Sequence, residues 1–299
     1  MGFHEFSSPY DWSRIASFKR TAKAAFGGMV DLSVGSPVDP VPDSVRKALG
    51  AASNDPNAYG YPVTAGTADL RSAIAEWFAA ARNVDLTAID ADVVPTVGSK
   101  EGVALMASLL HLGAGDVVVQ PKVSYPTYEI GTQLAGAEVL KVDDVADVES
   151  WKDAPGVKAI WVNSPCNPTG AVLAAEQMAA IVAAARGIGA VVLSDECYAL
   201  MQWGNVDVEA DADTLASTPC ALRPDVCGGS AQGVLVLYSL SKQSNMAGYR
   251  TAFIAGDKSL IVPMTAYRKQ IGQIIPGPVQ AAMAVGLRDL ESVKAQRKR

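Results

Sequence analysis

Hydrophobic residues follow two alternating patterns along this chain of 299 residues. Residues 66–82 carry Leu70, Ile74 and Trp77 at helical spacing, so one face of that segment is expected to enter a core. Short, mostly apolar runs that suit buried strands occur at 157–163, 189–193 and 233–238. This alternation predicts an α/β fold in which crossover helices connect the strands of a mostly parallel sheet.

Polar side chains stand just beyond the carboxyl ends of these three predicted strands. Asn167 follows the first run. Asp195 and Tyr198 follow the second, and Lys242 follows the third. Open α/β sheets bind ligands at the edge formed by the carboxyl ends of their parallel strands. We therefore expect these four side chains to share one ligand site.

The segment 239–250 suits a cofactor that carries both an aldehyde and a phosphate. The Lys242 amine can bond covalently to an aldehyde, and the arginine that ends the segment can bind a phosphate through two hydrogen bonds. A pyridine cofactor also needs an acid beside its ring nitrogen, which suits Asp195. It needs donors at its phenolic oxygen, which suit Asn167 and Tyr198. For Lys242 taken alone, a solvated lysine at a strand end is the alternative.

Three motifs in this order resemble those of the class I and II aminotransferases, which are pyridoxal-phosphate enzymes of fold type I. The motifs are Asn-Pro-x-Gly, Asp-x-x-Tyr, and Ser-x-Ser-Lys followed eight positions later by Arg. The resemblance implies pyridoxal phosphate as cofactor and a three-layer α/β/α arrangement. It also implies an N-terminal arm with part of a small domain at 1–40 and a large cofactor-binding domain at 41–275. Residues 276–299 would begin a helix that leads to a missing C-terminal small domain.

The resemblance implies roles for the residues of these motifs. Lys242 would bond to the cofactor and act as the base of the proton shift, with Asp195 as the partner of the ring nitrogen. Asn167 and Tyr198 would bind the phenolic oxygen, Tyr198 acting in catalysis as well. The implied phosphate ligands are Ser239, Ser241 and Arg250, together with Gly98, Ser99 and Lys100 at the start of a predicted helix.

Three further residues are matched outside these motifs. Tyr125 matches the aromatic residue that stacks on the cofactor ring, and we prefer it to Tyr128 because the stacking residue comes first in a Tyr-Pro-x-Tyr pattern. Tyr61 matches a tyrosine that reaches across to the partner subunit, which implies a homodimer. Gly35 matches a backbone position beside the substrate carboxylate. A turn tyrosine and a turn glycine are the alternatives for Tyr61 and Gly35.

The substrate is suggested by a narrower resemblance. Segments 123–132, 226–229 and 239–250 together resemble the actinobacterial succinyldiaminopimelate transaminases of lysine biosynthesis. This implies amino transfer between glutamate and N-succinyl-2-amino-6-oxopimelate, with 2-oxoglutarate as the partner oxo acid. The alternatives are an aminotransferase of broad aspartate or aromatic specificity, a C–S lyase, and a catalytically impaired fragment that binds the cofactor. An S-x-x-K motif typical of penicillin-binding enzymes is also present, but no S-D-N or K-T-G follows it.

Composition argues against several other classes of function. A net charge of −6 and a pI near 5.0, without a basic stripe, argue against nucleic-acid binding. The longest apolar stretch, 178–193, is interrupted by Arg186 and two glycines, which argues against a membrane span. Residues 1–17 lack the pattern of an export signal, so a cytoplasmic protein is expected. Four cysteines without a C-x-x-C pair, and two histidines, predict no metal site.

The C-terminal third yields three more expectations. Residues 204–233 are expected to form a long acidic surface loop. After Pro278 one helical pattern continues to the last residue without a Gly or Pro stop signal, and we expect its apolar face to be uncovered. No arginine is available to clamp the substrate α-carboxylate, since Arg268 and Arg288 are expected on helices away from the strand ends.

Overall fold

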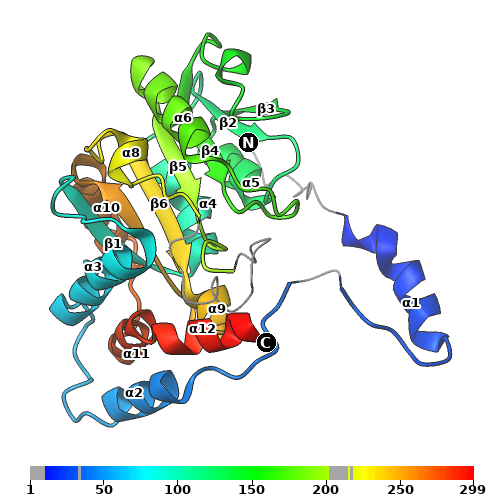
Figure 1. The fold of residues 1–299 in the computed structure, drawn as a ribbon, viewed down its shortest axis with the longest axis vertical. Helices are drawn as coiled ribbons and strands as arrows, with labels where there is room; N and C mark the ends of the chain where they lie inside the picture. Colours follow the sequence, from blue (N-terminus) through cyan, green and yellow to red (C-terminus); the bar gives the residue numbers. More distant parts are fainter. Residues whose placement is uncertain (1–10, 33–34, 202–214, 216–217) are drawn as a thin grey trace, which may run out of the picture. The chain divides into compact units, whose positions relative to one another are not determined.

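The computed structural model describes residues 11–32, 35–201, 215 and 218–299, which fall into two compact units, Met1–Ser36 and Pro37–Arg299. The described part of the second unit contains a seven-stranded sheet of order β1-β7-β6-β5-β4-β2-β3 (Figure 1). β7 runs antiparallel to β1 and β6, and the other neighbouring strands are parallel. The strands are β1 (Ala91–Val97), β2 (Val117–Pro121), β3 (Glu138–Val142), β4 (Val157–Asn163), β5 (Val191–Asp195), β6 (Val234–Ser239) and β7 (Thr251–Asp257).

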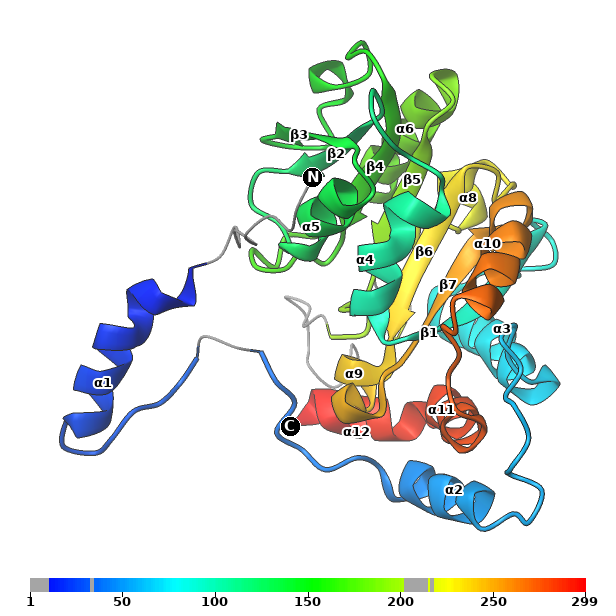
Figure 2. The ribbon, with the colours of Figure 1, turned by 180° about the vertical axis from the view of Figure 1, so that it is seen from behind.

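Helices cover both faces of this sheet, which confirms the predicted three-layer α/β fold (Figures 1 and 2). Alternate residues of β6 enter opposite clusters, with Val236 and Tyr238 on one face and Leu235 and Leu237 on the other. The first face packs against α3 (Ala68–Arg82), α6 (Ala175–Gly187) and α8 (Pro224–Cys227). The second packs against α4 (Ser99–Leu109), α5 (Thr127–Leu134) and α10 (Lys258–Gln270).

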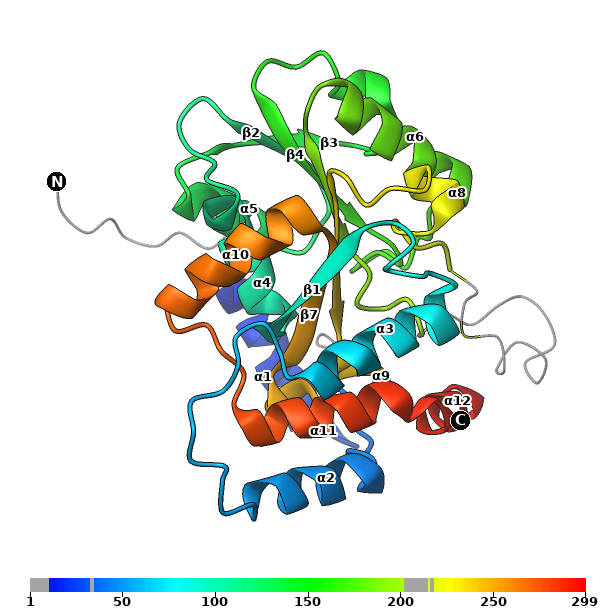
Figure 3. The ribbon, with the colours of Figure 1, turned by 90° about the vertical axis from the view of Figure 1, so that its left-hand side faces the viewer.

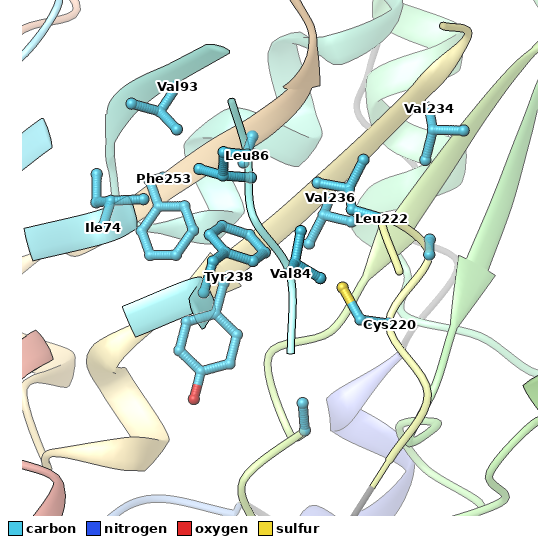
Figure 4. Packing of buried hydrophobic residues seen from close by; sticks show 14 of the residues in the cluster. Ile74, Val84, Leu86, Val93, Cys220, Leu222, Val234, Val236, Tyr238 and Phe253 are labelled. Atoms are coloured by element: carbon cyan, nitrogen blue, oxygen red, sulfur yellow. The ribbon is translucent and has the colours of Figure 1, made fainter. Parts of the chain in front are cut away.

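Aromatic rings fill the core between α3 and the sheet. The ring centroids of Trp77 and Tyr238 lie 4.2 Å apart, and Phe78 meets Phe253 edge to face at 5.8 Å. Figure 4 shows Tyr238 and Phe253 surrounded by β-branched and leucine side chains from the strands and from the segment after α3. The buried face predicted for the helix at 66–82 is therefore confirmed.

Four helices lie together beyond the end of the sheet at which β6 terminates (Figure 3). They are α2 (Asp43–Ser53), α9 (Leu240–Gln243), α11 (Gly277–Arg288) and α12 (Leu290–Lys298). The prediction of one continuous C-terminal helix is wrong, because Asp289 ends α11 and caps α12 through a hydrogen bond from the Ser292 amide of 3.1 Å. The prediction of an uncovered apolar face is also wrong, because Met283 and Leu287 are fully buried where α11 packs against α2 and α3.

The acidic surface loop predicted at 204–233 is only partly described. Residues 204–214, 216 and 217 lie outside the described residues. The later half is not a surface loop, since Cys220, Ala221 and Leu222 are at most 1% exposed and α8 follows them. All the acidic residues except Asp225 belong to the first half, whereas this second half supplies apolar side chains to the core on the α3 face.

The first unit contains a 3-10 turn, η1 (Trp12–Ile15), and the helix α1 (Ala16–Ala24). Asp11 caps η1 by accepting a hydrogen bond of 2.9 Å from the Ser13 amide. Lys19 forms an ion pair of 3.0 Å with Asp31, which ties the helix to the segment that follows it. Two further 3-10 turns, η2 (Val148–Ser150) and η3 (Ala247–Tyr249), belong to the second unit.

Candidate active site

The strand register brings the predicted site segments to one edge of the sheet. Asn163 at the end of β4 is the register partner of Asp195 at the end of β5, and Asp195 is that of Leu237 near the end of β6. The last residue of β1, Val97, pairs with the first residue of β7, Thr251. The segments after β1, β4, β5 and β6 and the segment before β7 therefore converge at this edge.

Asp195 is a buried carboxylate whose two oxygens accept hydrogen bonds from neutral donors. Oδ2 accepts from the Tyr128 hydroxyl at 2.7 Å, and Oδ1 accepts from the Cys197 amide at 3.1 Å. Burial raises the pKa of Asp195 above the ordinary aspartate value, and the two hydrogen bonds partly offset that rise. A positively charged group beside Asp195 would favour its ionised form. The site thus suits a protonated ring nitrogen.

Tyr128 was considered from the sequence only as the alternative to Tyr125 for stacking, and its contact with Asp195 was not predicted. It is 1% exposed, its ring stacks on Trp161 at 4.4 Å, and its hydroxyl is the donor to Asp195. Burial, and then Asp195, raise the pKa of the Tyr128 phenol well above its ordinary value, so the hydroxyl keeps its proton. Tyr125 is half-buried with its ring 5.7 Å from that of Tyr128. The Tyr-Pro-x-Tyr pattern marks both tyrosines as candidates, but the sequence did not show that the two have different contacts.

The loop after β4 is organised by Asn163, which was also missed. Its side-chain amide donates to the Asp195 carbonyl at 2.9 Å, and its side-chain oxygen accepts from the Asn167 amide at 2.7 Å. Asn163 is 7% exposed, whereas the predicted ligand Asn167 is half-buried. One buried amide therefore fixes Asn167 relative to the end of β5. A polar residue at the carboxyl end of a mostly apolar strand was the available signal.

Lys242 and Tyr198 lie close together at the same edge. The Lys242 ammonium is 5.6 Å from the centroid of the Tyr198 ring. Burial lowers the pKa of Lys242, which favours the neutral amine that a nucleophile requires. Burial, and then the neighbouring Cys197 and Asp195, raise the pKa of Tyr198 to about 12, so its hydroxyl is a proton donor at neutral pH.

The predicted phosphate ligands gather where β1 ends and β7 begins. Gly98 has a φ of 76°, and a Cβ at this position would come within 2.6 Å of the Arg250 Cζ. Glycine is therefore needed for the guanidinium to approach this backbone. The Ser239 hydroxyl caps α9 by accepting from the Ser241 amide at 3.1 Å, and the two hydroxyls are 2.8 Å apart.

Four further predicted site residues are half-buried or exposed. Ser99 is half-buried. Burial first, and Asp195 second, raise the pKa of the Cys197 thiol well above its ordinary value. Lys100 lies exposed in the first turn of α4. The Tyr61 side chain is fully exposed. Gly35 belongs to the first unit and is exposed there.

Two arginines considered for a substrate clamp have other partners. Arg268 is fully buried and forms an ion pair of 2.7 Å with Glu101, which itself accepts from the Val97 amide at 3.0 Å. Arg288 forms ion pairs with Asp69 and Glu76. Both pairs connect helices, so these arginines serve the packing around the sheet. Among the described residues, no helix is both long and apolar enough to cross a bilayer.

Comparison with known proteins settles the family. The family model described as aminotransferase class I and II matches residues 27–299. The chain belongs to this family. Class I and II aminotransferases depend on pyridoxal phosphate, and the residues present fit that cofactor: a lysine of lowered pKa, a buried acid with neutral partners, and an arginine against a glycine backbone.

Individual relatives agree with this assignment. Probable aminotransferase Rv1178 of Mycobacterium tuberculosis is 42% identical over 97% of this chain, which spans 65% of that protein's length. The 4-dedimethylamino-4-oxo-anhydrotetracycline transaminase OxyQ of Streptomyces rimosus is 40% identical over 97% of this chain and 75% of its own length. Among solved structures, N-succinyldiaminopimelate aminotransferase from Mycobacterium tuberculosis has a TM-score of 0.75 and 27% identity, covering 89% of this chain and 68% of that one.

Proposed function

We propose that this chain binds pyridoxal phosphate and transfers an amino group between an amino acid and a 2-oxo acid. The observation that carries this proposal is the position of Lys242: it lies in α9, directly after β6, with its ammonium 5.6 Å from the Tyr198 ring. β6 pairs with β5, which ends at Asp195. Bound pyridoxal phosphate would supply the electron sink for breaking a bond at the substrate α-carbon. The protein residues would bind, orient and move protons.

Each side chain has a distinct task in this proposal. Asp195, supported by the Tyr128 hydroxyl, holds a proton on the ring nitrogen. The Lys242 Nζ holds the cofactor and, when neutral, moves a proton from the substrate α-carbon. Tyr198 and Asn167 donate to the phenolic oxygen, Asn167 from a loop that Asn163 fixes.

The phosphate would lie between the end of β1 and the start of β7. Gly98 and Arg250 form this place, with Ser99 and Lys100 in the first turn of α4 and the Ser239 and Ser241 hydroxyls from the end of β6. The free amides of a helix N-terminus and a guanidinium both favour a dianion. Tyr125 would lie against the ring. Tyr61, fully exposed in the single chain, would reach the site of a second copy in a homodimer, and Gly35 would lie beside the substrate carboxylate.

For the substrate, we propose glutamate with N-succinyl-2-amino-6-oxopimelate, a step of lysine biosynthesis. The similarity of segments 123–132, 226–229 and 239–250 to succinyldiaminopimelate transaminases supports this choice, as does the likeness to the solved enzyme of that name. A second candidate is amino transfer to a ketone on a larger ring system, which the 40% identity to OxyQ favours.

Two measurements test the proposal. Borohydride reduction of the chain with pyridoxal phosphate, followed by peptide mapping, should label Lys242, and labelling of Lys100 or Lys258 instead would overturn the assignment. Product analysis with glutamate then compares the succinylated oxo acid with a cyclic ketone acceptor. Formation of 2-oxoglutarate with only the cyclic ketone would replace the first substrate by the second, and formation with neither would overturn both.

A further inference from the structure

The turn that carries Lys242 is short and depends on neighbouring helices for its position. α9 spans only Leu240–Gln243, so its own backbone supplies few hydrogen bonds. The backbone after it turns through Asn245, which has a φ of 56°. Asparagine tolerates this left-handed conformation better than most residues, but the conformation alone does not fix where the turn lies.

A single side chain of the C-terminal helix α12 contacts this turn at two points. The Gln296 Nε2 donates to the Lys242 carbonyl at 3.2 Å. The Gln296 Oε1 accepts from the Asn245 side-chain amide at 2.8 Å. Because a carbonyl can only accept, the NH2 group of Gln296 must face Lys242, and its oxygen is then correctly placed for Asn245.

The same glutamine also touches the segment that follows Tyr198. Its Nε2 lies 3.8 Å from the Met201 sulfur, and the Met201 amide donates to the Tyr198 carbonyl at 2.9 Å. The two segments that carry the base and the phenol of the proposed site therefore meet at Gln296. α12 in turn is fixed at its start, where the Asp289 carboxylate accepts from the Ser44 hydroxyl of α2.

We infer that Gln296 is a positioning residue: from outside the cofactor site, it holds the backbone of Lys242 so that the lysine side chain meets the cofactor aldehyde. This inference rests on the proposed function of Lys242. Gln243 supports the other side of the turn, since its side chain accepts from the Trp77 indole at 3.0 Å and donates to the Gly286 carbonyl at 3.2 Å. Gln296 is half-buried whereas Gln243 is 1% exposed, which makes Gln296 the better of the two glutamines for substitution.

Three variants separate the two contacts of Gln296. Gln296→Leu removes both. Gln296→Glu keeps an acceptor for Asn245 but places an oxygen against the Lys242 carbonyl. Asn245→Gly keeps the left-handed backbone accessible and removes only the side-chain amide. Lys298→Ala, an exposed position on the same helix, is the matched control.

The measurement is the rate at which bound pyridoxal phosphate leaves each protein, followed by its absorbance with a scavenger present, alongside thermal unfolding of the cofactor-free chains. One lost neutral hydrogen bond corresponds to about a twofold to tenfold change in an equilibrium. We expect about fivefold faster release in Gln296→Leu and Gln296→Glu, about threefold in Asn245→Gly, and no change in Lys298→Ala. The double variant Gln296→Leu/Asn245→Gly should show less than the product of the two single effects, because the two residues share one hydrogen bond. Asn245 also donates to the Pro40 carbonyl at 3.3 Å, and that bond is lost only in the variants that replace Asn245.

The proposed function and the role of Gln296 can fail independently of each other. If borohydride does not label Lys242 in the unsubstituted chain, the proposed function fails. If Lys242 is labelled but Gln296→Leu and Asn245→Gly release the cofactor as slowly as Lys298→Ala, the role of Gln296 fails while the proposed function stands. A misplaced lysine should shift the pH dependence of the bound-cofactor absorbance. The role of Gln296 would therefore also be overturned if this pH dependence were unchanged and release became faster only in proportion to a lower unfolding temperature.

Discussion

Two consecutive carboxylates at the end of β5 have opposite environments. Asp195 points to the face of the sheet that holds Tyr128, and both of its oxygens meet neutral donors. Glu196 points to the other face, is 1% exposed, and forms an ion pair of 2.7 Å with the fully buried Arg82. Because side chains alternate along a strand, one step in sequence moves a carboxylate from one environment to the other.

The difference shows which of the two acids is available to a ligand. Glu196 also accepts hydrogen bonds from the Ala221 amide at 2.8 Å and the Ser194 hydroxyl at 3.0 Å, so its charge is compensated within the protein. Arg82 in turn donates to Thr218 at 2.8 Å. Asp195 has a raised pKa caused first by burial, and its charge is left for a bound cation to compensate. Glu196 thus contributes to stability, and Asp195 is the acid that we propose to act on the cofactor.

The largest expected effect comes from Asp195→Asn. An asparagine keeps the shape of the side chain but cannot hold a proton on the cofactor ring nitrogen. We expect turnover to fall at least about a thousandfold, or about 4 kcal/mol in the barrier. Unfolding of the cofactor-free chain should be unchanged or occur at slightly higher temperature, since a buried charge is removed. Steady-state kinetics and calorimetry check both parts, and a loss of activity below about tenfold would make Asp195 merely structural.

Glu196→Gln should lower the stability of the chain and leave cofactor binding intact. It leaves the buried Arg82 guanidinium without a counter-charge, and breaking a buried ion pair typically costs about 3–5 kcal/mol. We expect the free energy of unfolding to fall by about 3 kcal/mol, measured by urea denaturation. Binding of pyridoxal phosphate to the remaining folded protein should be retained at low temperature. Equal stability of Glu196→Gln and Asp195→Asn would remove the contrast between the two acids.

Tyr128→Phe tests whether the Tyr128 hydroxyl controls the pKa of Asp195. Losing the phenol donor raises the pKa of Asp195 further, because a hydrogen bond to its charged form is gone. The proposed function needs ionised Asp195, so we expect activity to be lost at acid pH. The acid limb of the pH–activity profile should move to higher pH by up to about one unit, near 1.4 kcal/mol. The control is Tyr238→Phe, which removes another buried hydroxyl, one bonded to Gln243. An acid limb that stays in place would show that Tyr128 only fills space.

The fold and the motif residues could be predicted from the sequence because both depend on local patterns. Apolar runs mark the strands, and polar residues just after them mark the ligand edge, so Asp195 and Lys242 could be assigned to that edge from the sequence alone. Tyr128 and Gln296 could not, because their roles depend on contacts with residues 67 and 54 positions away. The break at Asp289 was missed because an aspartate cap is a weaker stop signal than glycine or proline.

The smallest effect concerns Lys242 and the stability of the cofactor-free chain. Burial lowers the pKa of Lys242, so the folded state disfavours its charged form. The cost is present while the amine is charged in both the folded and the unfolded chain, and it disappears as pH rises through the lowered folded-state pKa and then the ordinary lysine value. Lys242→Met should therefore raise the unfolding temperature at neutral pH by about 2 °C, on the scale expected for less than 1 kcal/mol in a chain of this size. The gain should shrink in alkaline solution.

Lys258→Met, at an exposed lysine paired with Asp90, should show no such gain. A stabilisation of Lys242→Met that is the same at neutral and alkaline pH would mean that the methionine acts by packing and that the charge of Lys242 carries no cost.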